Sequence, residues 1–177
     1  MNGPLVFRLD DIELHIGRDP LSVFASHRQT SFLHSEAGGQ LFGRAGQRRW
    51  NITHATGPDL RDRRCRNRFV PDRERERRDI AEFYARGFDY LGDWHTHPQN
   101  SPEPSPRDLT SIDEIVRQST HDMPGFLLCV VGRHAPPKGL WLSLHRVDGS
   151  AVRALPASDR PAAARGPASY GSVAADE

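Results

Sequence analysis

The stretch GDWHTHPQNSPEPSPRD, residues 92–108, decides how the rest of this chain is interpreted. It begins at the end of a strand expected over residues 88–97, where His95 and His97 are two positions apart and project from the same face. Prolines stiffen the loop that follows, and a helix is expected from residue 106 to about residue 118, with Asp108 in its first turn. Such a loop can carry Asp108 back to the histidines. Two imidazoles and one carboxylate suit a catalytic zinc ion, which usually keeps three protein ligands and an open position for water.

Each part of this stretch also has a purely structural interpretation. Ser105 and Pro106 followed by Asp108 are typical of a helix N-terminus, with a serine cap, proline in the first turn and an acid three residues on. The two interpretations are compatible, because the serine can cap the helix while the carboxylate binds a metal. A bare His-x-His is a weak signal, and by itself it favours two ordinary polar residues on an exposed strand. The full pattern, with Ser105 seven positions after Pro98 and Asp108 three further on, is much more specific.

With this pattern the sequence resembles the JAB/MPN (JAMM) metalloproteases, whose motif it matches at every spaced position. That family carries an upstream glutamate beside a glycine-rich strand. Residues 34–43, HSEAGGQLFG, are similar to that segment, with Glu36 in the catalytic place. The resemblance covers about residues 5–147. It implies a zinc-dependent peptidase or isopeptidase with one zinc ion per chain.

The resemblance also implies a role for each matching residue. His95, His97 and Asp108 match the zinc ligands of the family. Glu36 matches the general base, which takes a proton from the attacking water and passes it to the leaving amine. Ser105 matches the residue that hydrogen-bonds the oxyanion of the tetrahedral intermediate. Outside this context, Glu36 would be interpreted as a surface carboxylate at a turn.

Three other residues have simpler expectations. Asp93 alternates onto the face of the two histidines, where it either orients one of them or is an ordinary polar position. Trp94 faces the other way and is expected in the core. Cys129 lies in an apolar strand and is expected to be a buried small hydrophobe.

The whole chain has the size and composition of one soluble domain. It has 177 residues, of which 36% are hydrophobic and 27% charged, enough for a hydrophobic core. The pattern predicts one or two strands within residues 5–16 and further strands over 37–44, 49–56, 88–97, 126–131 and 140–147. It predicts helices over 20–27, 71–86 and 106–118. We therefore expect a single α/β (α+β) domain over residues 3–149, and the family resemblance implies a curved mixed sheet flanked by helices, similar in architecture to the cytidine deaminases.

The remainder, residues 150–177, is rich in alanine, proline and serine and is expected to be a disordered tail. Lys+Arg is 24 and Asp+Glu is 23, so no global charge favours nucleic acid or a membrane. The arginine-rich block 61–78 is interleaved with acids, which favours a solvated face with local ion pairs over a dock for an acidic partner. Two cysteines without paired spacing and no visible secretory signal indicate the cytoplasm.

Further stretches narrow the resemblance to one branch. Residues 55–58, 62–64, 69–73 and 92–98 resemble compact bacterial (Prok-JAB) proteins encoded beside ubiquitin-like conjugation enzymes, and above all the deconjugating peptidases of type II CBASS anti-phage operons. This implies cleavage of the bond between a target lysine and the C-terminal tail of a cGAS-like nucleotidyltransferase or ubiquitin-like protein. The activating and conjugating enzymes would be separate functional partners.

Three alternatives stay open beside this one. A related branch trims the C-terminus of ubiquitin-like or sulfur-carrier proteins with the same metal site. A non-catalytic MPN scaffold would have lost its ligands, whereas this chain keeps Glu36, the two histidines, Ser105 and Asp108. An amidohydrolase-type site would need a barrel for which this chain is too short.

Overall fold

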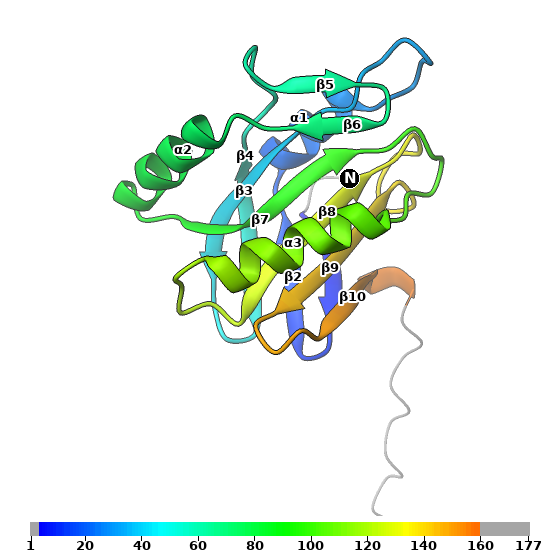
Figure 1. Cartoon of the computed structure of the whole chain (residues 1–177). Coiled ribbons are helices and arrows are strands. Elements are labelled where there is room, and N and C mark those ends of the chain that lie inside the picture. The colour runs from blue at the N-terminus through cyan, green and yellow to red at the C-terminus, as the bar shows by residue number, and fades with distance from the viewer. Residues whose placement is uncertain (1–3, 160–177) are drawn as a thin grey trace, which may run out of the picture.

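The computed structural model describes residues 4–159 and shows a mixed sheet that closes on itself (Figure 1). The strand order around the closed sheet is β1-β10-β9-β8-β7-β3-β4-β2. The β2–β4 and β7–β8 pairs are parallel and the other neighbours are antiparallel. The strands of this sheet are β1 (Leu5–Leu9), β2 (Ile12–Ile16), β3 (Gly38–Ala45), β4 (Arg49–Ala55), β7 (Asp89–Thr96), β8 (Gly125–Val131), β9 (Leu140–Arg146) and β10 (Ala151–Pro156).

Three α-helices and one hairpin in the described chain complete the domain. The helices are α1 (Arg18–His27), α2 (Arg73–Ala85) and α3 (Pro106–Gln118), and a 3-10 turn, η1 (Ala157–Asp159), follows β10. Strands β5 (Arg63–Cys65) and β6 (Arg68–Val70) form a separate two-stranded hairpin, which stands over the end of β7 in Figure 1. No helix within residues 4–159 is both long and apolar enough to cross a membrane. The expected single α/β domain with a curved mixed sheet is confirmed.

Strand β8 shows why the sheet and α3 belong together. All of its residues are buried, because one face points into the closed sheet and the other lies under α3 (Figure 1). A strand covered on both faces needs a continuous apolar run instead of an alternating one. The inward residues are Leu127, Cys129 and Val131, and the residues packed with Ile112 and Val116 of α3 are Phe126, Leu128 and Val130.

Strand β7 separates the core from the functional face. Trp94 is buried inside the sheet, its ring centroid 5.0 Å from that of Phe24 on α1. Its indole N–H donates to the Thr56 carbonyl at 2.9 Å. The expected core positions of Trp94 and Cys129 are therefore confirmed. Because neighbours alternate along a strand, Asp93 and His95 are left on the outer face.

The expected domain boundary after Gly149 is wrong, because the chain continues as β10 in the closed sheet. Val152 pairs with Leu144 of β9, and Phe7 of β1 pairs with Pro156. In β10 only Ala154 is buried, and Val152 packs against the core, so β10 adds few apolar contacts to its backbone hydrogen bonds. The disorder expected over 150–159 is thus overturned, and residues 160–177 lie outside the described residues.

Gly92 offers a test of how tightly β7 packs on β8. Its φ is 141° and an added Cβ would overlap the backbone of Leu127. Gly92→Ala is expected to lower the free energy of unfolding by about 3–4 kcal/mol, since backbone strain and a clash combine. Gly149→Ala is the matched control, because its φ is 82° but nothing lies within 4 Å of the added atom, so only about 1 kcal/mol is lost. Urea denaturation measures both, and equal losses would contradict the packing argument.

Candidate metal centre and active site

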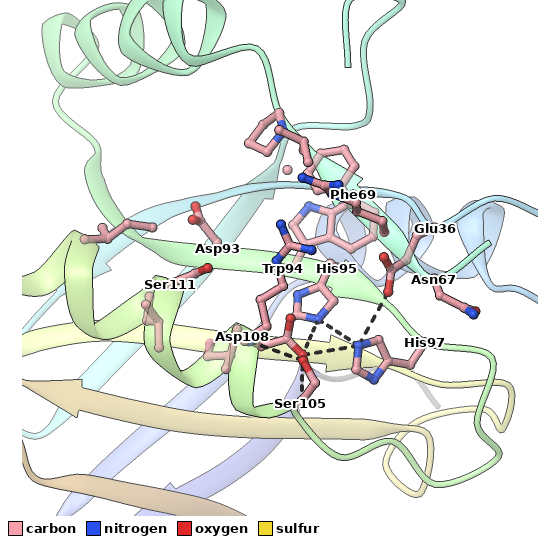
Figure 2. Close-up of a pocket in the computed structure, with 18 of the residues that line it drawn as sticks. Glu36, Asn67, Phe69, Asp93, Trp94, His95, His97, Ser105, Asp108 and Ser111 are labelled. Atoms are coloured by element: carbon pink, nitrogen blue, oxygen red, sulfur yellow. Dashed lines mark hydrogen bonds and ion pairs between the residues drawn. The ribbon is translucent and has the colours of Figure 1, made fainter. Parts of the chain in front are cut away.

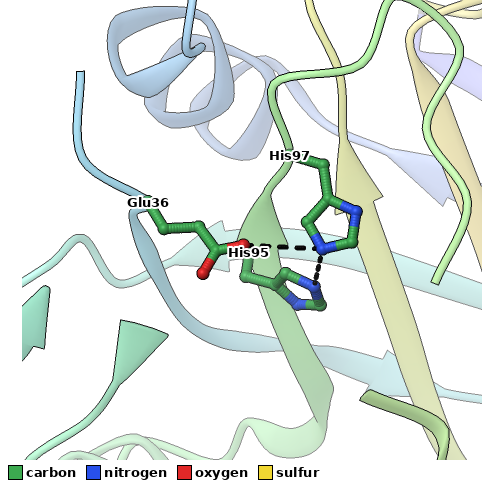
Figure 3. Close-up of side chains that lie close together, drawn as sticks. All are labelled: Glu36, His95 and His97. Carbon is green, nitrogen blue, oxygen red and sulfur yellow. Dashed lines mark hydrogen bonds and ion pairs between the residues drawn. The ribbon is translucent and has the colours of Figure 1, made fainter. Parts of the chain in front are cut away.

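The two histidines of the sequence motif meet at the end of β7 (Figure 3). His95 and His97 bring their Nε2 atoms to 3.1 Å from each other. The Oδ2 atom of Asp108 lies 3.4 Å from His95 Nε2 and 3.3 Å from His97 Nε2. Ligands of a tetrahedral zinc ion with bonds of about 2.0–2.1 Å are separated by about 3.3 Å. The three donor atoms therefore already have the spacing and the chemistry of a zinc site.

Glu36 reaches this centre through strand pairing. Gly38 pairs with His95 in the β3–β7 ladder, and the next step is held by Thr96, whose backbone N–H donates to the Ala37 carbonyl at 2.8 Å. Continuing the register places Glu36 opposite His97, and its Oε1 atom lies 3.5 Å from His97 Nε2. Glu36, His95 and His97 offer ligand atoms that all lie within 4.8 Å of one another. Geometry alone thus allows Glu36 to act either as a ligand or as a base beside the metal.

Ser105 and Asp108 combine the two interpretations of their motif. They form a capping box at the start of α3, in which Asp108 N–H donates to Ser105 Oγ at 3.3 Å and Ser105 N–H donates to Asp108 Oδ2 at 2.6 Å. The same Oδ2 atom faces both imidazoles (Figure 2). The cap therefore fixes the carboxylate in place. Because a hydroxyl has one donor as well as acceptor lone pairs, Ser105 Oγ keeps its proton for a further partner.

Burial and neighbouring groups shift the pKa values of Glu36 and Asp108 in opposite directions. Burial raises the pKa of Glu36 to about 7, the range that suits a general base at neutral pH. Burial would also raise the pKa of Asp108, but hydrogen bonds from His95 and His97 outweigh it and hold that pKa well below its usual range. Asp108 is therefore an anion, as a metal ligand must be, while Glu36 can take up and release a proton.

The β5–β6 hairpin holds Glu36 in position. Glu36 N–H donates to the Cys65 carbonyl at 2.8 Å, and Arg64 Nε donates to the Glu36 carbonyl at 2.7 Å. The backbone of Phe69 acts to lower the pKa of the Glu36 carboxyl group against the effect of burial, and the Phe69 ring occupies the space beside Gly38 where a Cβ would stand. The interpretation of residues 61–78 as a solvated face therefore holds only in part: Arg73 and Arg75 of α2 form ion pairs with Glu76 and Asp79 as expected, but Arg64 belongs to the site.

A cavity of about 400 Å³ opens over these residues (Figure 2). Its floor is β7, one wall is β6 and the other is α3. The cavity contains every predicted site residue, namely Glu36, His95, His97, Ser105 and Asp108.

Asp93 lines the same cavity but does not orient a histidine. Its Oδ1 atom accepts a hydrogen bond from the Tyr90 hydroxyl at 2.7 Å. Arg64 and the hairpin were missed from the sequence, because β5 is entirely exposed and arginine-rich. Asn67 in the turn, followed by Phe69 and Val70, was the available signal.

The fold and the site together define a JAB-type domain with the residues of a metal-dependent hydrolase. A family model described as Prok-JAB, prokaryotic homologs of the JAB domain, matches residues 19–144. The chain therefore belongs to the Prok-JAB family. The solution structure of protein DSY2949 from Desulfitobacterium hafniense is similar in fold, with a TM-score of 0.55 at 19% identity over 78% of this chain and 87% of that one.

Several relatives carry a more particular name, CD-NTase/cGAS isopeptidase. The protein from Pseudomonas aeruginosa (strain BWHPSA011 / Pa011) is 34% identical over 126 residues, which is 69% of this chain and 78% of the relative. The protein from Escherichia coli (strain TW11681) is 34% identical over 145 residues, which is 78% of this chain and 86% of the relative.

Proposed function

We propose that this protein is a cytoplasmic zinc isopeptidase that releases the C-terminal tail of a conjugated protein from its target amine. The observation that carries the proposal is the convergence of His95, His97 and Asp108 in a cleft, with Glu36 beside them. A scaffold that had lost its chemistry would have no reason to keep this set. The names of the relatives support a cGAS-like nucleotidyltransferase as the conjugated protein, and hence reversal of conjugation in anti-phage defence.

Each residue of the site has a separate role in the proposed reaction. His95, His97 and Asp108 would hold one zinc ion, which supplies Lewis-acid polarisation of a carbonyl and a water of near-neutral pKa. Glu36 accepts a proton from the attacking water and returns it to the leaving amine, which is a poor leaving group until it is protonated. The Ser105 hydroxyl donates to the oxyanion that forms as the carbonyl is attacked.

The hairpin supplies a place for the tail of the substrate. Strand β6 pairs only with β5 within the described chain, and its other edge lines the cleft. An extended tail can add to such an edge through main-chain hydrogen bonds. Since Phe69 of the same strand and Glu36 line the same cavity, a tail bound here would bring its final peptide unit to the base.

A gel assay of the purified chain tests the proposal. The substrate is a cGAS-like nucleotidyltransferase joined through its C-terminus to lysine, and the controls are a chelator and Glu36→Ala. Cleavage at the junction, lost in both controls, is expected. A second substrate, a ubiquitin-like protein with a short C-terminal extension, distinguishes isopeptide cleavage from C-terminal processing. Trimming of that substrate alone would favour the branch that processes ubiquitin-like or sulfur-carrier proteins. Zinc binding without cleavage of either substrate would contradict a peptidase.

Arg64→Ala tests whether the hairpin positions the base. The variant is expected to lower kcat about 10- to 100-fold at unchanged zinc content, because small displacements of a catalytic group are costly. Arg63→Ala, on the neighbouring position of the same exposed strand, is the matched control and should retain wild-type kcat. If Arg64→Ala changed only KM, the hairpin would bind substrate without holding Glu36.

A further inference from the structure

A second groove runs from the catalytic cavity between α2 and α3, with a volume of about 920 Å³. Its floor includes Gln40 of β3 and Asp93 of β7, which pair directly across the two strands. Arg73, Glu76 and Asp93 line both the groove and the catalytic cavity. The two spaces are therefore continuous. Figure 2 shows Asp93 beyond His95 along β7, on the side away from Glu36.

Gln40 carries an acceptor without a partner at the floor of this groove. Its side chain is 2% exposed, and its Oε1 atom has no hydrogen-bond partner among the described residues. Leaving such an atom unpaired costs free energy, so buried polar groups are nearly always satisfied. Because Gln40 lines the groove, a turn of its amide would present this oxygen to a hydrogen-bond donor there.

The surrounding charges select a cationic donor. Asp93 accepts a hydrogen bond from Tyr90, which leaves its other oxygen for a further donor. Arg73 is already paired with Glu76, at 2.7 Å. The carboxylates that line the groove are Glu76, Asp89, Asp93, Glu114 and Asp122, against the guanidinium groups of Arg73 and Arg77. Acceptors therefore outnumber cations, and an ammonium or guanidinium group is the complementary ligand.

The layout of the cleft indicates which part of the substrate reaches the groove. Strand β6 follows Asn67, which lines the catalytic cavity together with Glu36, and the chain leads through Val70 toward Arg73, which lines both spaces. A tail extended along β6 with its last carbonyl at the metal centre would run from the groove toward Glu36. Asp93 and His95 are two positions apart on a strand, about 7 Å. An extended tail rises about 3.3 Å per residue, so the side chain over Asp93 is at least two residues before the scissile bond, and the second to fourth residues are the candidates.

We propose that Gln40 and Asp93 form a subsite for a lysine or arginine side chain located two to four residues before the scissile bond. This inference rests on the proposed function, since it names a residue of the tail that the isopeptidase would release. Three N–H donors of an ammonium group can reach the Gln40 amide oxygen and the Asp93 carboxylate together. The subsite would make the enzyme prefer tails with a basic residue at this place.

Binding of tail peptides tests the subsite without relying on turnover. The probes are fluorescein-labelled decapeptides of alanine and serine with one lysine at the second, third or fourth position before the C-terminal residue, each compared with its norleucine equivalent. Fluorescence polarisation with the zinc-loaded full chain carrying Glu36→Gln gives the Kd values. At one of the three positions, lysine is expected to bind about tenfold more tightly than norleucine.

Variants of the floor then decide whether Gln40 and Asp93 are responsible. Gln40→Met and Asp93→Asn are each expected to reduce the lysine-to-norleucine ratio toward one, with zinc content measured in parallel. Glu82→Gln removes the same charge from an exposed position of α2, with a side chain 71% exposed, and should keep the wild-type ratio. A ratio near one in the parent chain, or a preference that survives both floor variants, would overturn the subsite.

The same peptides joined to a lysine ε-amine separate the two proposals. Cleavage of all peptides at equal kcat/KM, together with equal binding, would support the isopeptidase proposal and contradict the subsite proposal. Selective binding of lysine-containing tails without cleavage would support the subsite proposal and contradict the isopeptidase proposal.

Discussion

Glu36→Ala is expected to keep one zinc ion per chain and to lower kcat/KM for the conjugate by about 10²–10⁴-fold, the usual contribution of a general acid–base. The reason is the arrangement at the end of β7. Asp108 Oδ2 lies at ligand spacing from both imidazoles, so the metal keeps three donors when Glu36 is lost. Only the group that moves the proton to the leaving amine is removed. Zinc is measured by elemental analysis and turnover by the gel assay.

If Glu36 were a metal ligand, its replacement would have a different effect on zinc content. Glu36, His95 and His97 form a compact cluster, and if Glu36 were a ligand its loss would release zinc together with activity. Glu36→Gln keeps the size of the buried side chain and controls for damage to the fold. Loss of zinc in both variants would contradict the role of base, and cleavage by either at the wild-type rate would contradict the mechanism.

The motif could be predicted from the sequence because its geometry is local. The spacing of His95 and His97 is a property of any strand. The proline-containing loop was expected to carry Asp108 back to them, and the capping box of Ser105 and Asp108 marks where the helix begins. The continuous apolar run over residues 126–131 likewise predicted the strand that the structure shows as β8. These features need no knowledge of distant contacts, and the structure places each where it was expected.

Other features depend on contacts that no local pattern records. Glu36 faces His97 because β3 pairs with β7 in one particular register, and the sequence led to Glu36 only through the family resemblance. Strand β10 was missed because a short stretch with one buried alanine has no hydrophobic signal. Its place is set by backbone groups of β1 and β9 on either side.

The proposed subsite depends entirely on contacts between segments that are distant in the sequence. Gln40 stands in a glycine-rich stretch and Asp93 beside the metal motif, and neither position suggests a shared ligand. They meet because the two strands are neighbours, and they form a groove because α2 and α3 stand on either side. Specificity in this family member would thus arise from tertiary packing around a site whose chemistry is local.

His97→Ala is expected to abolish both zinc binding and turnover, which distinguishes it from Glu36→Ala. His97 Nε2 lies 3.1 Å from His95 Nε2 and 3.3 Å from Asp108 Oδ2, so its removal takes one of three ligands from the centre. Zinc at 100 times its Kd should stabilise the parent chain by about 2.7 kcal/mol. For a domain of this size that corresponds to a rise in Tm of about 5–10 °C.

The thermal shift makes this prediction independent of any substrate. His97→Ala should show no rise in Tm when zinc is added to the metal-free protein, while its Tm without metal should stay close to that of the metal-free parent. His134→Ala, at an exposed position outside the cavity, should keep the full zinc-dependent rise. A zinc-dependent rise of parental size in His97→Ala would place the metal elsewhere, because a centre built on His95 and Asp108 alone cannot keep the affinity of three ligands.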